Sequence, residues 1–141
     1  MSKRLIPYIT MDGNAKEAIE FYKEALDAQL LFIQTFGEMP ENPDFPIPAE
    51  VKERVGHATL KVGETELMFS DTFPGSPFSS GNQVSICITT DSVEQAQKMF
   101  DALQQGGQVG MPLQETHFSP AYGNVTDKFG VTFQMFTEAR S

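Results

Sequence analysis

The sequence has few of the residues that several classes of protein depend on. Cys87 is its only cysteine among 141 residues, which excludes an intrachain disulfide and a zinc site built from several thiolates. No apolar run approaches the roughly 20 residues of a membrane span, and residues 1–4 lead into a short predicted strand rather than a signal peptide. We therefore expect a cytoplasmic protein with no membrane partner.

Positive charge is also scarce. The chain has 10 Lys and Arg against 19 Asp and Glu, a formal net charge of −9. Such a chain repels the phosphates of nucleic acids, so we expect no nucleic-acid partner. Most of the acidic residues fall in predicted helices and loops, where they favour solubility and do not indicate a cation site.

Several well-known motifs are missing. The sequence has no GxGxxG, no P-loop, no Ser-His-Asp order and no Cys-His constellation, so nucleotide-dependent and triad chemistry have no support. The length of 141 residues fits one domain that can bury its own core.

The sequence predicts two amphipathic helices. Residues 14–17 and 92–95 each place a Glu or Gln three residues after an N-cap side chain, which is a capping box. Apolar residues then recur at helical spacing over 15–26 and 93–103. Gly106-Gly107 is expected to end the second helix.

Strands are predicted on both sides of each helix, by β-rich segments bounded by turn residues. The expected strands are 4–10, 28–36, 55–62 and 66–70 in the first half, and 82–90, 108–112, 123–127 and 131–137 in the second. The stretch 37–54 contains four prolines, at positions 40, 43, 46 and 48, and predicts a long loop without regular structure.

The two halves repeat one plan. Their helix caps and apolar stripes superpose, and residues 63–69 resemble residues 130–136 once the proline-rich loop is treated as an insertion. This predicts an α+β fold of two βαβββ modules, about 1–75 and 80–141, in a single domain. We expect the modules to form a curved mixed sheet around a pocket, because one half alone would expose an apolar sheet face.

Motifs along nearly the whole chain carry a family resemblance. They are Pro7-Tyr8-Ile9, Gly13-Asn14-Ala15, Ala18-Ile19-Glu20-Phe21-Tyr22, Phe36-Gly37-Glu38-Met39-Pro40, Gly56-His57-Ala58, Phe69-Ser70-Asp71 and residues 122–131. As a set they resemble the PhnB-like branch of the vicinal oxygen chelate superfamily, which includes glyoxalases, bleomycin-resistance proteins and extradiol dioxygenases. Some members of this branch bear a methyltransferase label. We find no glycine-rich strand-to-helix turn that could hold S-adenosylmethionine, and we expect no cofactor.

The resemblance also implies where a metal would bind. Metal-using members take His, Glu or Gln ligands from the first and last strand of each module, and counting from the helix caps places these positions at Pro7, Met68, Ser85 and Gln134. Only Gln134 offers a suitable donor. Divalent cations in this fold need three or four oxygen or nitrogen donors, so we expect no metal site.

Two histidines are candidate catalytic residues. Strand alternation could direct His57, together with Thr59, toward the cavity, where it would act as an acid, a base or an anchor; a structural role is equally consistent with the pattern. His117 lies in the polar and aromatic segment 115–122, which borders the pocket in the resembling proteins, near an aromatic at Phe118. The alternative for His117 is an ordinary surface-loop histidine.

Tyr122 is the third catalytic candidate, because Gly123 leaves room for a ligand beside its phenol; a tyrosine packed at a strand start is the alternative. Cys87 lies in an apolar run and is expected to be a buried, inert thiol. Asp71 is read as a turn residue before Pro74-Gly75, and Asp127 as closing its own turn. The expected ligand-binding residues are Phe36, Met39, His57, Thr59, Met68, Ser70, Ser85, Cys87, Phe118, Tyr122 and Gln134.

The leading functional hypothesis is a metal-independent pocket protein that binds a small, partly apolar organic molecule. The alternative is a glyoxalase-like lyase, isomerase or dioxygenase that uses His57, His117 or a displaced divalent metal. A third possibility is an interaction or regulatory module. We also expect a homodimer, with the proline-rich loop lying across the interface.

Overall fold

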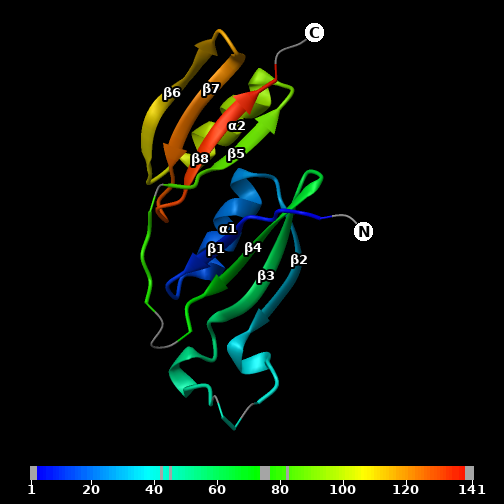
Figure 1. The fold of residues 1–141 in the computed structure, drawn as a ribbon, viewed down its shortest axis with the longest axis vertical. Helices are drawn as coiled ribbons and strands as arrows, with labels where there is room; N and C mark the ends of the chain where they lie inside the picture. The colour runs from blue at the N-terminus through cyan, green and yellow to red at the C-terminus, as the bar shows by residue number, and fades with distance from the viewer. Residues whose placement is uncertain (1–2, 42, 45, 74–76, 82, 139–141) are drawn as a thin grey trace. The chain divides into compact units, whose positions relative to one another are not determined.

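Both halves of the chain fold on the same plan in the computed structural model (Figure 1), which describes residues 3–41, 43–44, 46–73, 77–81 and 83–138. The chain divides into two units, Met1–Phe78 (unit 1) and Ser79–Ser141 (unit 2). Among these described residues, each unit holds a four-stranded mixed sheet and one α-helix.

Unit 1 follows the order β-α-β-β-β. Its elements are β1 (Tyr8–Met11), α1 (Ala15–Ala25), β2 (Gln29–Thr35), β3 (Val55–Val62) and β4 (Thr65–Asp71). The strands lie in the order β1-β4-β3-β2, with β1 parallel to β4 and the other neighbours antiparallel. The first strand of the unit is therefore paired with the last.

Unit 2 repeats this order. Its elements are β5 (Ile86–Thr90), α2 (Val93–Leu103), β6 (Gln108–Thr116), β7 (Ser119–Thr126) and β8 (Thr132–Thr137). The strands lie in the order β5-β8-β7-β6, again with the first and last strands parallel. The expected α+β fold of two βαβββ modules is confirmed.

In each unit the helix covers one face of the sheet. The Tyr22 ring of α1 stacks on Phe69 of β4 with centroids 5.5 Å apart, and both side chains are buried. In unit 2, α2 packs on β5, β7 and β8, and buries Phe100 against a sheet face that includes Phe133 and Met135. Along β4 and β8, buried residues alternate with half-buried ones. We call the face away from the helix the open face of each sheet.

The sequence predicted both helices and β3 closely, but several boundaries were wrong. The strand expected at 82–90 begins at Ile86, and its first expected residue, Asn82, lies outside the described residues. In its described part, the expected loop 37–54 contains the short 3-10 helix η2 (Ala49–Val51), and a second one, η1 (Phe36–Glu38), overlaps its start.

The segment 115–122 is a hairpin rather than a loop. Strand β6 continues to Thr116, β7 begins at Ser119, and His117 and Phe118 form the turn between them. Pro112 made the longer strand hard to predict, because proline removes a ladder donor. It is tolerated here because β6 lies at the edge of its sheet.

Two aspartates fix the backbone. Asp127 accepts bonds from the backbone N–H groups of Phe129 and Val131, at 2.9 and 3.0 Å, so its predicted turn role is confirmed. Asp71 was not predicted correctly. Its buried carboxylate accepts the N–H groups of Gly13, Ala15 and Val55 at 2.8, 3.0 and 2.9 Å, and so joins β4 to the start of α1 and of β3. The turn expected at Pro74-Gly75 lies outside the described residues.

Within the described part of the chain, no helix combines the length and the apolar character needed to cross a membrane.

Candidate functional site

Strand pairing shows which residues of the two units correspond. Met11 pairs with Asp71 at the end of β4, and Thr90 pairs with Thr137 at the end of β8. Counting back along the same ladders, Tyr8 pairs with Met68 and Cys87 pairs with Gln134. Tyr8 therefore corresponds to Cys87, and Met68 to Gln134.

This correspondence corrects the expected first-strand positions. Counting from the helix caps placed them at Pro7 and Ser85, but residues 12–14 join β1 to α1 whereas only residues 91–92 join β5 to α2. The first turn is thus one residue longer, which shifts the alignment of the strands by one. The side chain beside Met68 in the sheet is that of Tyr8, not of Pro7.

The third strands of the two units also correspond. Ala58 pairs with Phe69, and Gly123 pairs with Met135, the equivalent residue of unit 2. Each is preceded by a candidate catalytic residue, so His57 and Tyr122 occupy equivalent positions.

A chain of hydrogen bonds crosses the open face of unit 2. The Tyr122 hydroxyl donates to Oε1 of Gln134 at 2.5 Å, and Nε2 of Gln134 donates to Oγ of Ser85 at 2.8 Å. These three residues come from β7, from β8 and from the segment just before β5. The structure thus brings together three of the predicted ligand-binding residues, which we call the Tyr122 relay.

Aromatic rings lie beside this relay. The Phe118 ring stacks on Phe136 with centroids 5.9 Å apart and meets Tyr122 edge-on at 5.0 Å. His117 contacts the Phe118 ring at 5.1 Å. Phe118 is 43% exposed, so part of its ring is open to a ligand. Sequence reasoning missed Phe136, although its place two residues after Gln134 on a strand was a usable signal.

Cys87 is exposed, which contradicts the expectation of a buried thiol. The apolar run around it suggested burial on both sides of a strand, but the residues of β5 alternate, and those beside Cys87 are less exposed. Partial burial still raises the pKa of the Cys87 thiol by desolvation. The thiol is therefore less ionised at neutral pH than an ordinary cysteine, which disfavours a nucleophilic role.

The open face of unit 1 carries a second polar group of side chains. His57 Nδ1 lies 3.4 Å from the Tyr8 hydroxyl, and His57 Nε2 lies 3.3 Å from Oγ1 of Thr59. The Phe32 ring is 6.1 Å from the His57 ring. Met68 lies beside Tyr8 on this face, and Ser70 follows Met68 at strand spacing. Tyr8 and Phe32 were not among the predicted site residues.

Phe36 and Met39 lie elsewhere in unit 1. They line a hollow of about 320 Å³ within the proline-rich segment, together with Pro43, Pro46 and Lys52. A Cβ placed on Gly56 would meet the Met39 methyl group at 2.1 Å, so this glycine leaves the space that the Met39 side chain fills. Met39 thus packs against β3, and the Phe36 ring meets the Phe73 ring edge-on with centroids 5.7 Å apart.

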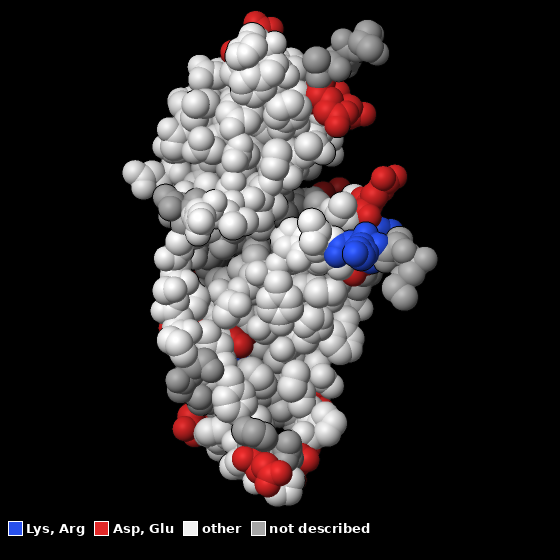
Figure 2. Space-filling model, in the orientation of Figure 1, with Lys and Arg blue, Asp and Glu red and all other residues white. Residues whose placement is uncertain are grey.

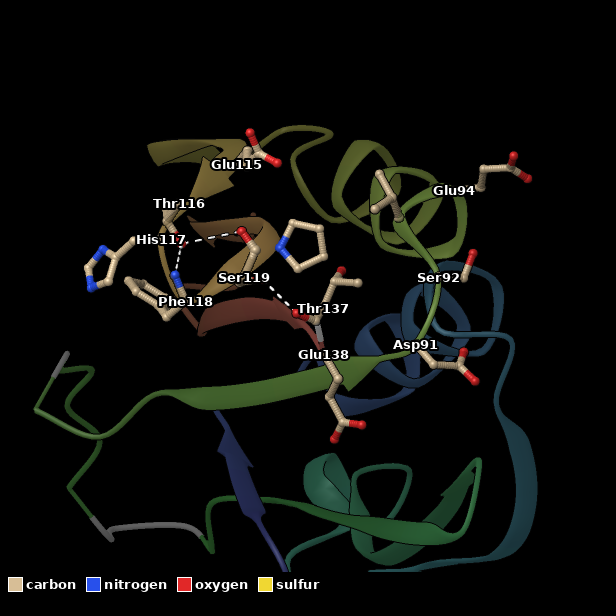
Figure 3. Close-up of a pocket in the computed structure, with 12 residues that line it drawn as sticks. Asp91, Ser92, Glu94, Glu115, Thr116, His117, Phe118, Ser119, Thr137 and Glu138 are labelled. Carbon is tan, nitrogen blue, oxygen red and sulfur yellow. Dashed lines mark hydrogen bonds between the residues drawn. The ribbon is translucent and has the colours of Figure 1, made fainter. Parts of the chain in front are cut away.

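His117 and Phe118 also line a groove of about 590 Å³ at one end of unit 2 (Figure 3). Ser119 and Thr137 lie within it, and the buried Ser119 hydroxyl donates to the Thr137 carbonyl at 2.7 Å. The carboxylates of its lining are those of Asp91, Glu94, Glu115 and Glu138. All four are exposed, and such residues are ordinary near a helix start and strand ends.

The side chains of the site can be compared with the ligands that a divalent cation needs. Oε1 of Gln134 already accepts from Tyr122, and the corresponding position in unit 1 carries the thioether of Met68. Among the described residues, no three His, Cys, Asp or Glu side chains are placed to hold an ion together. On the face of the molecule seen in Figure 2, the Asp and Glu side chains form separate clusters. This donor set does not fit the three or four oxygen or nitrogen ligands of a divalent cation.

The turns between the first strand and the helix of each unit are where S-adenosylmethionine would have to bind. In unit 1 the turn contains one glycine, Gly13, with φ of 95°, and its N–H is bound to the Asp71 carboxylate. The N–H of Ala15 at the start of α1 is bound to the same oxygen. Residues 91–92 of unit 2 include no glycine. Neither turn fits a nucleoside-type cofactor, which needs free backbone N–H groups at a close approach.

Comparisons with known proteins assign the family. A family model described as 3-demethylubiquinone-9 3-methyltransferase matches residues 3–136. Protein YjdN of Escherichia coli (strain K12) is 32% identical over 142 residues, which cover 93% of this chain and 92% of that protein.

Two solved structures are also similar to this chain, and one of them bears the same family description. Protein PA1353 from Pseudomonas aeruginosa is 36% identical, with 97% of this chain and 98% of that chain covered and a TM-score of 0.87. A putative 3-demethylubiquinone-9 3-methyltransferase, PhnB protein, from Bacillus cereus is 26% identical over 96% and 99% of the two chains, with a TM-score of 0.75.

A glyoxylase/bleomycin resistance protein/dioxygenase domain from Frankia sp. EAN1pec shares the fold, with a TM-score of 0.68 at 12% identity over 99% of both chains. The two βαβββ units are thus those of the glyoxalase/bleomycin-resistance fold. The chain belongs to the PhnB-like family described as 3-demethylubiquinone-9 3-methyltransferase.

Proposed function

We propose that this protein binds a small, uncharged, partly apolar organic molecule on the open faces of its sheets, with both units acting as one domain. The observation that carries the proposal is the Tyr122 relay, in which neutral polar groups lie beside exposed aromatic surface. Pockets for small molecules typically combine apolar and aromatic lining with a few placed polar groups.

The proposal includes the absence of the superfamily's divalent cation. One neutral amide, already bonded to a phenol, competes poorly with water for such an ion. Methyl transfer, the activity in the family's description, is not part of the proposal either, because the Asp71 carboxylate occupies the N–H groups where α1 begins.

Protein purified without chelator tests this function directly. Elemental analysis is expected to find zinc, nickel, manganese and iron well below one ion per chain, and mass spectrometry of the denatured protein to find an organic molecule that co-purifies. Gln134→Ala should lose that molecule, whereas Thr132→Val, which removes one hydroxyl contact between the same two strands, should retain it. A near-stoichiometric metal that Gln134→Ala abolishes would contradict the proposal.

A second candidate is an enzyme of the superfamily, a lyase, an isomerase or a dioxygenase. Its support is His57, whose two ring nitrogens each face a hydroxyl, because an imidazole has two nitrogens that can exchange protons with neighbouring groups. Turnover of a screened substrate that His57→Gln abolishes, with binding retained, would place this candidate first.

We also propose that the protein is a cytoplasmic homodimer. The exposed Leu31, Phe32 and Ile33 on the edge strand β2 support a partner surface, since edge strands with apolar side chains tend to be covered. Light scattering at micromolar concentration tests the assembly, and a monomeric mass would contradict it.

A further inference from the structure

We infer that the open face of unit 2 selects both the class of its ligand and the orientation in which it binds. The ligand is an uncharged aromatic molecule that presents a hydrogen-bond donor to Tyr122 and a hydrogen-bond acceptor to Ser85. The inference rests on the proposed function and names the class of ligand that this site selects. It follows from the order of donors and acceptors along the Tyr122 relay.

The relay fixes which groups remain for a ligand. The single hydroxyl hydrogen of Tyr122 is used in its bond to Gln134, so the phenol oxygen can only accept a further bond. Ser85 Oγ accepts from the Gln134 amide, so its own hydrogen is left to donate. The two ends of the relay therefore have opposite polarity, and Gln134 sets that polarity.

The aromatic rings indicate the rest of the ligand. Phe118 and Phe136 are within 17° of parallel, and Tyr122 stands nearly perpendicular to both. A flat ring laid on the exposed part of Phe118 gains stacking in the offset or edge geometry that aromatic pairs prefer. A planar aromatic ligand fits this surface better than a branched aliphatic one.

Charge selects against ions. The open-face residues of β7 and β8 are Pro120, Tyr122, Asn124, Thr126, Thr132, Gln134 and Phe136, and within these described strands none is charged. A carboxylate or an ammonium on the ligand would lose hydration here without gaining a counter-charge. The ligand is therefore neutral at the atoms that contact this face.

Four small probes test the inference: 4-hydroxyacetophenone carries both a donor and an acceptor, 4-methoxyacetophenone lacks the donor, 4-ethylphenol lacks the acceptor, and 4-hydroxybenzoate is charged. Their dissociation constants are measured by NMR titration of labelled protein. We expect 4-hydroxyacetophenone to bind about five- to tenfold more tightly than each of the others, which is within the range for the net contribution of one hydrogen bond.

Variants then test which residue of the Tyr122 relay recognises the donor of the ligand and which recognises its acceptor. Tyr122→Phe should abolish the preference for 4-hydroxyacetophenone over its methoxy analogue, and Ser85→Ala the preference over 4-ethylphenol. Gln134→Met, which installs the unit 1 residue, should abolish both, while Thr132→Val should change neither. Far-UV circular dichroism checks that each variant is folded.

Equal binding of all four probes to the wild type would overturn the directional reading while leaving a binding function in place. Failure of every probe to bind would also overturn it, whereas a co-purified organic molecule would still support the proposed function. Preferences that survive in Tyr122→Phe and Ser85→Ala would show that other groups set the selectivity.

Discussion

Units 1 and 2 share the same order of strands and helix but differ in the polar side chains that join these elements by hydrogen bonds. In unit 1 the Asp71 carboxylate, at the end of β4, accepts hydrogen bonds from three backbone N–H groups. At the equivalent place in unit 2, the hydroxyls of Thr90 and Thr137 lie 3.0 Å apart, and Ser119 donates to the Thr137 carbonyl. The comparison teaches that a repeated fold keeps its apolar contacts while its polar links diverge.

The open faces differ in the same way. Where unit 2 has Tyr122 and Gln134, unit 1 has His57 and Met68. An amide that bonds on both sides is replaced by a thioether that accepts hydrogen bonds only weakly. The units therefore offer a ligand different chemistry on similar sheets, and four experiments break or sharpen this comparison.

The largest effect is expected from Asp71→Ala, which leaves three N–H groups of unit 1 without their partner. The free energy of unfolding should fall by about 3–5 kcal/mol, because the buried donors of Ala15 and Val55 each cost about 1–3 kcal/mol when orphaned and the part-buried donor of Gly13 costs less. Hydrogen exchange resolved by residue should show the loss in unit 1. Thr137→Val, the matched change in unit 2, should cost about 1–2 kcal/mol. Equal losses in the two variants would show that the hydrogen bonds of Asp71 and those of Thr137 stabilise their units equally.

A smaller effect is expected from Gly123→Ala. Its Cβ would lie 2.8 Å from the Met111 carbonyl oxygen and 3.0 Å from the Leu113 backbone, which cannot move aside as a side chain can. We expect a loss of about 2–3 kcal/mol, measured by chemical denaturation. The reciprocal control is Ala58→Gly at the equivalent buried position, with a loss of about 1 kcal/mol. A neutral Gly123→Ala would mean that β6 is free to shift.

The helix caps provide a third test. Ser92 Oγ accepts the N–H of Gln95 at 3.2 Å, whereas the Asn14 side chain makes no such bond within the described residues. Ser92→Ala should therefore cost about 1 kcal/mol, and Asn14→Ala less than about 0.5 kcal/mol. Thermal unfolding of the two variants measures the difference. A larger loss at Asn14 would show that Asp71 is not the effective cap of α1.

The smallest effect is a shift in reactivity at Cys87. Desolvation raises the pKa of this thiol, and only the thiolate reacts with iodoacetamide. The alkylation rate of the folded protein should therefore reach its midpoint at a higher pH than that of the protein unfolded in urea. A lower midpoint in the folded protein would indicate a nearby cation and an activated thiol.

Local signals predicted much of the fold. The capping residues and apolar spacing placed α2 at its observed bounds, and alternation placed His57 and Thr59 on one face. These features depend on neighbours within a few residues of each other, which a single sequence displays.

What the sequence could not show depends on distant partners. The role of Asp71 required knowing that residues 13, 15 and 55 meet at the end of β4. Likewise, the exposure of Cys87 depended on which face α2 covers. The alignment error at Pro7 arose from a one-residue difference in turn length, which only strand pairing reveals.

Pairing the first strand with the last has a consequence for synthesis. β1 has no place to bind until β4 has been made, and the bond from Gly13 to Asp71 spans 58 residues. Contacts of such long range slow folding, because a loop must close before they form. We expect the nascent chain to hold β1 unpaired on the ribosome until about half of the protein has emerged, a period in which the exposed strand is most open to chaperones and to misassembly.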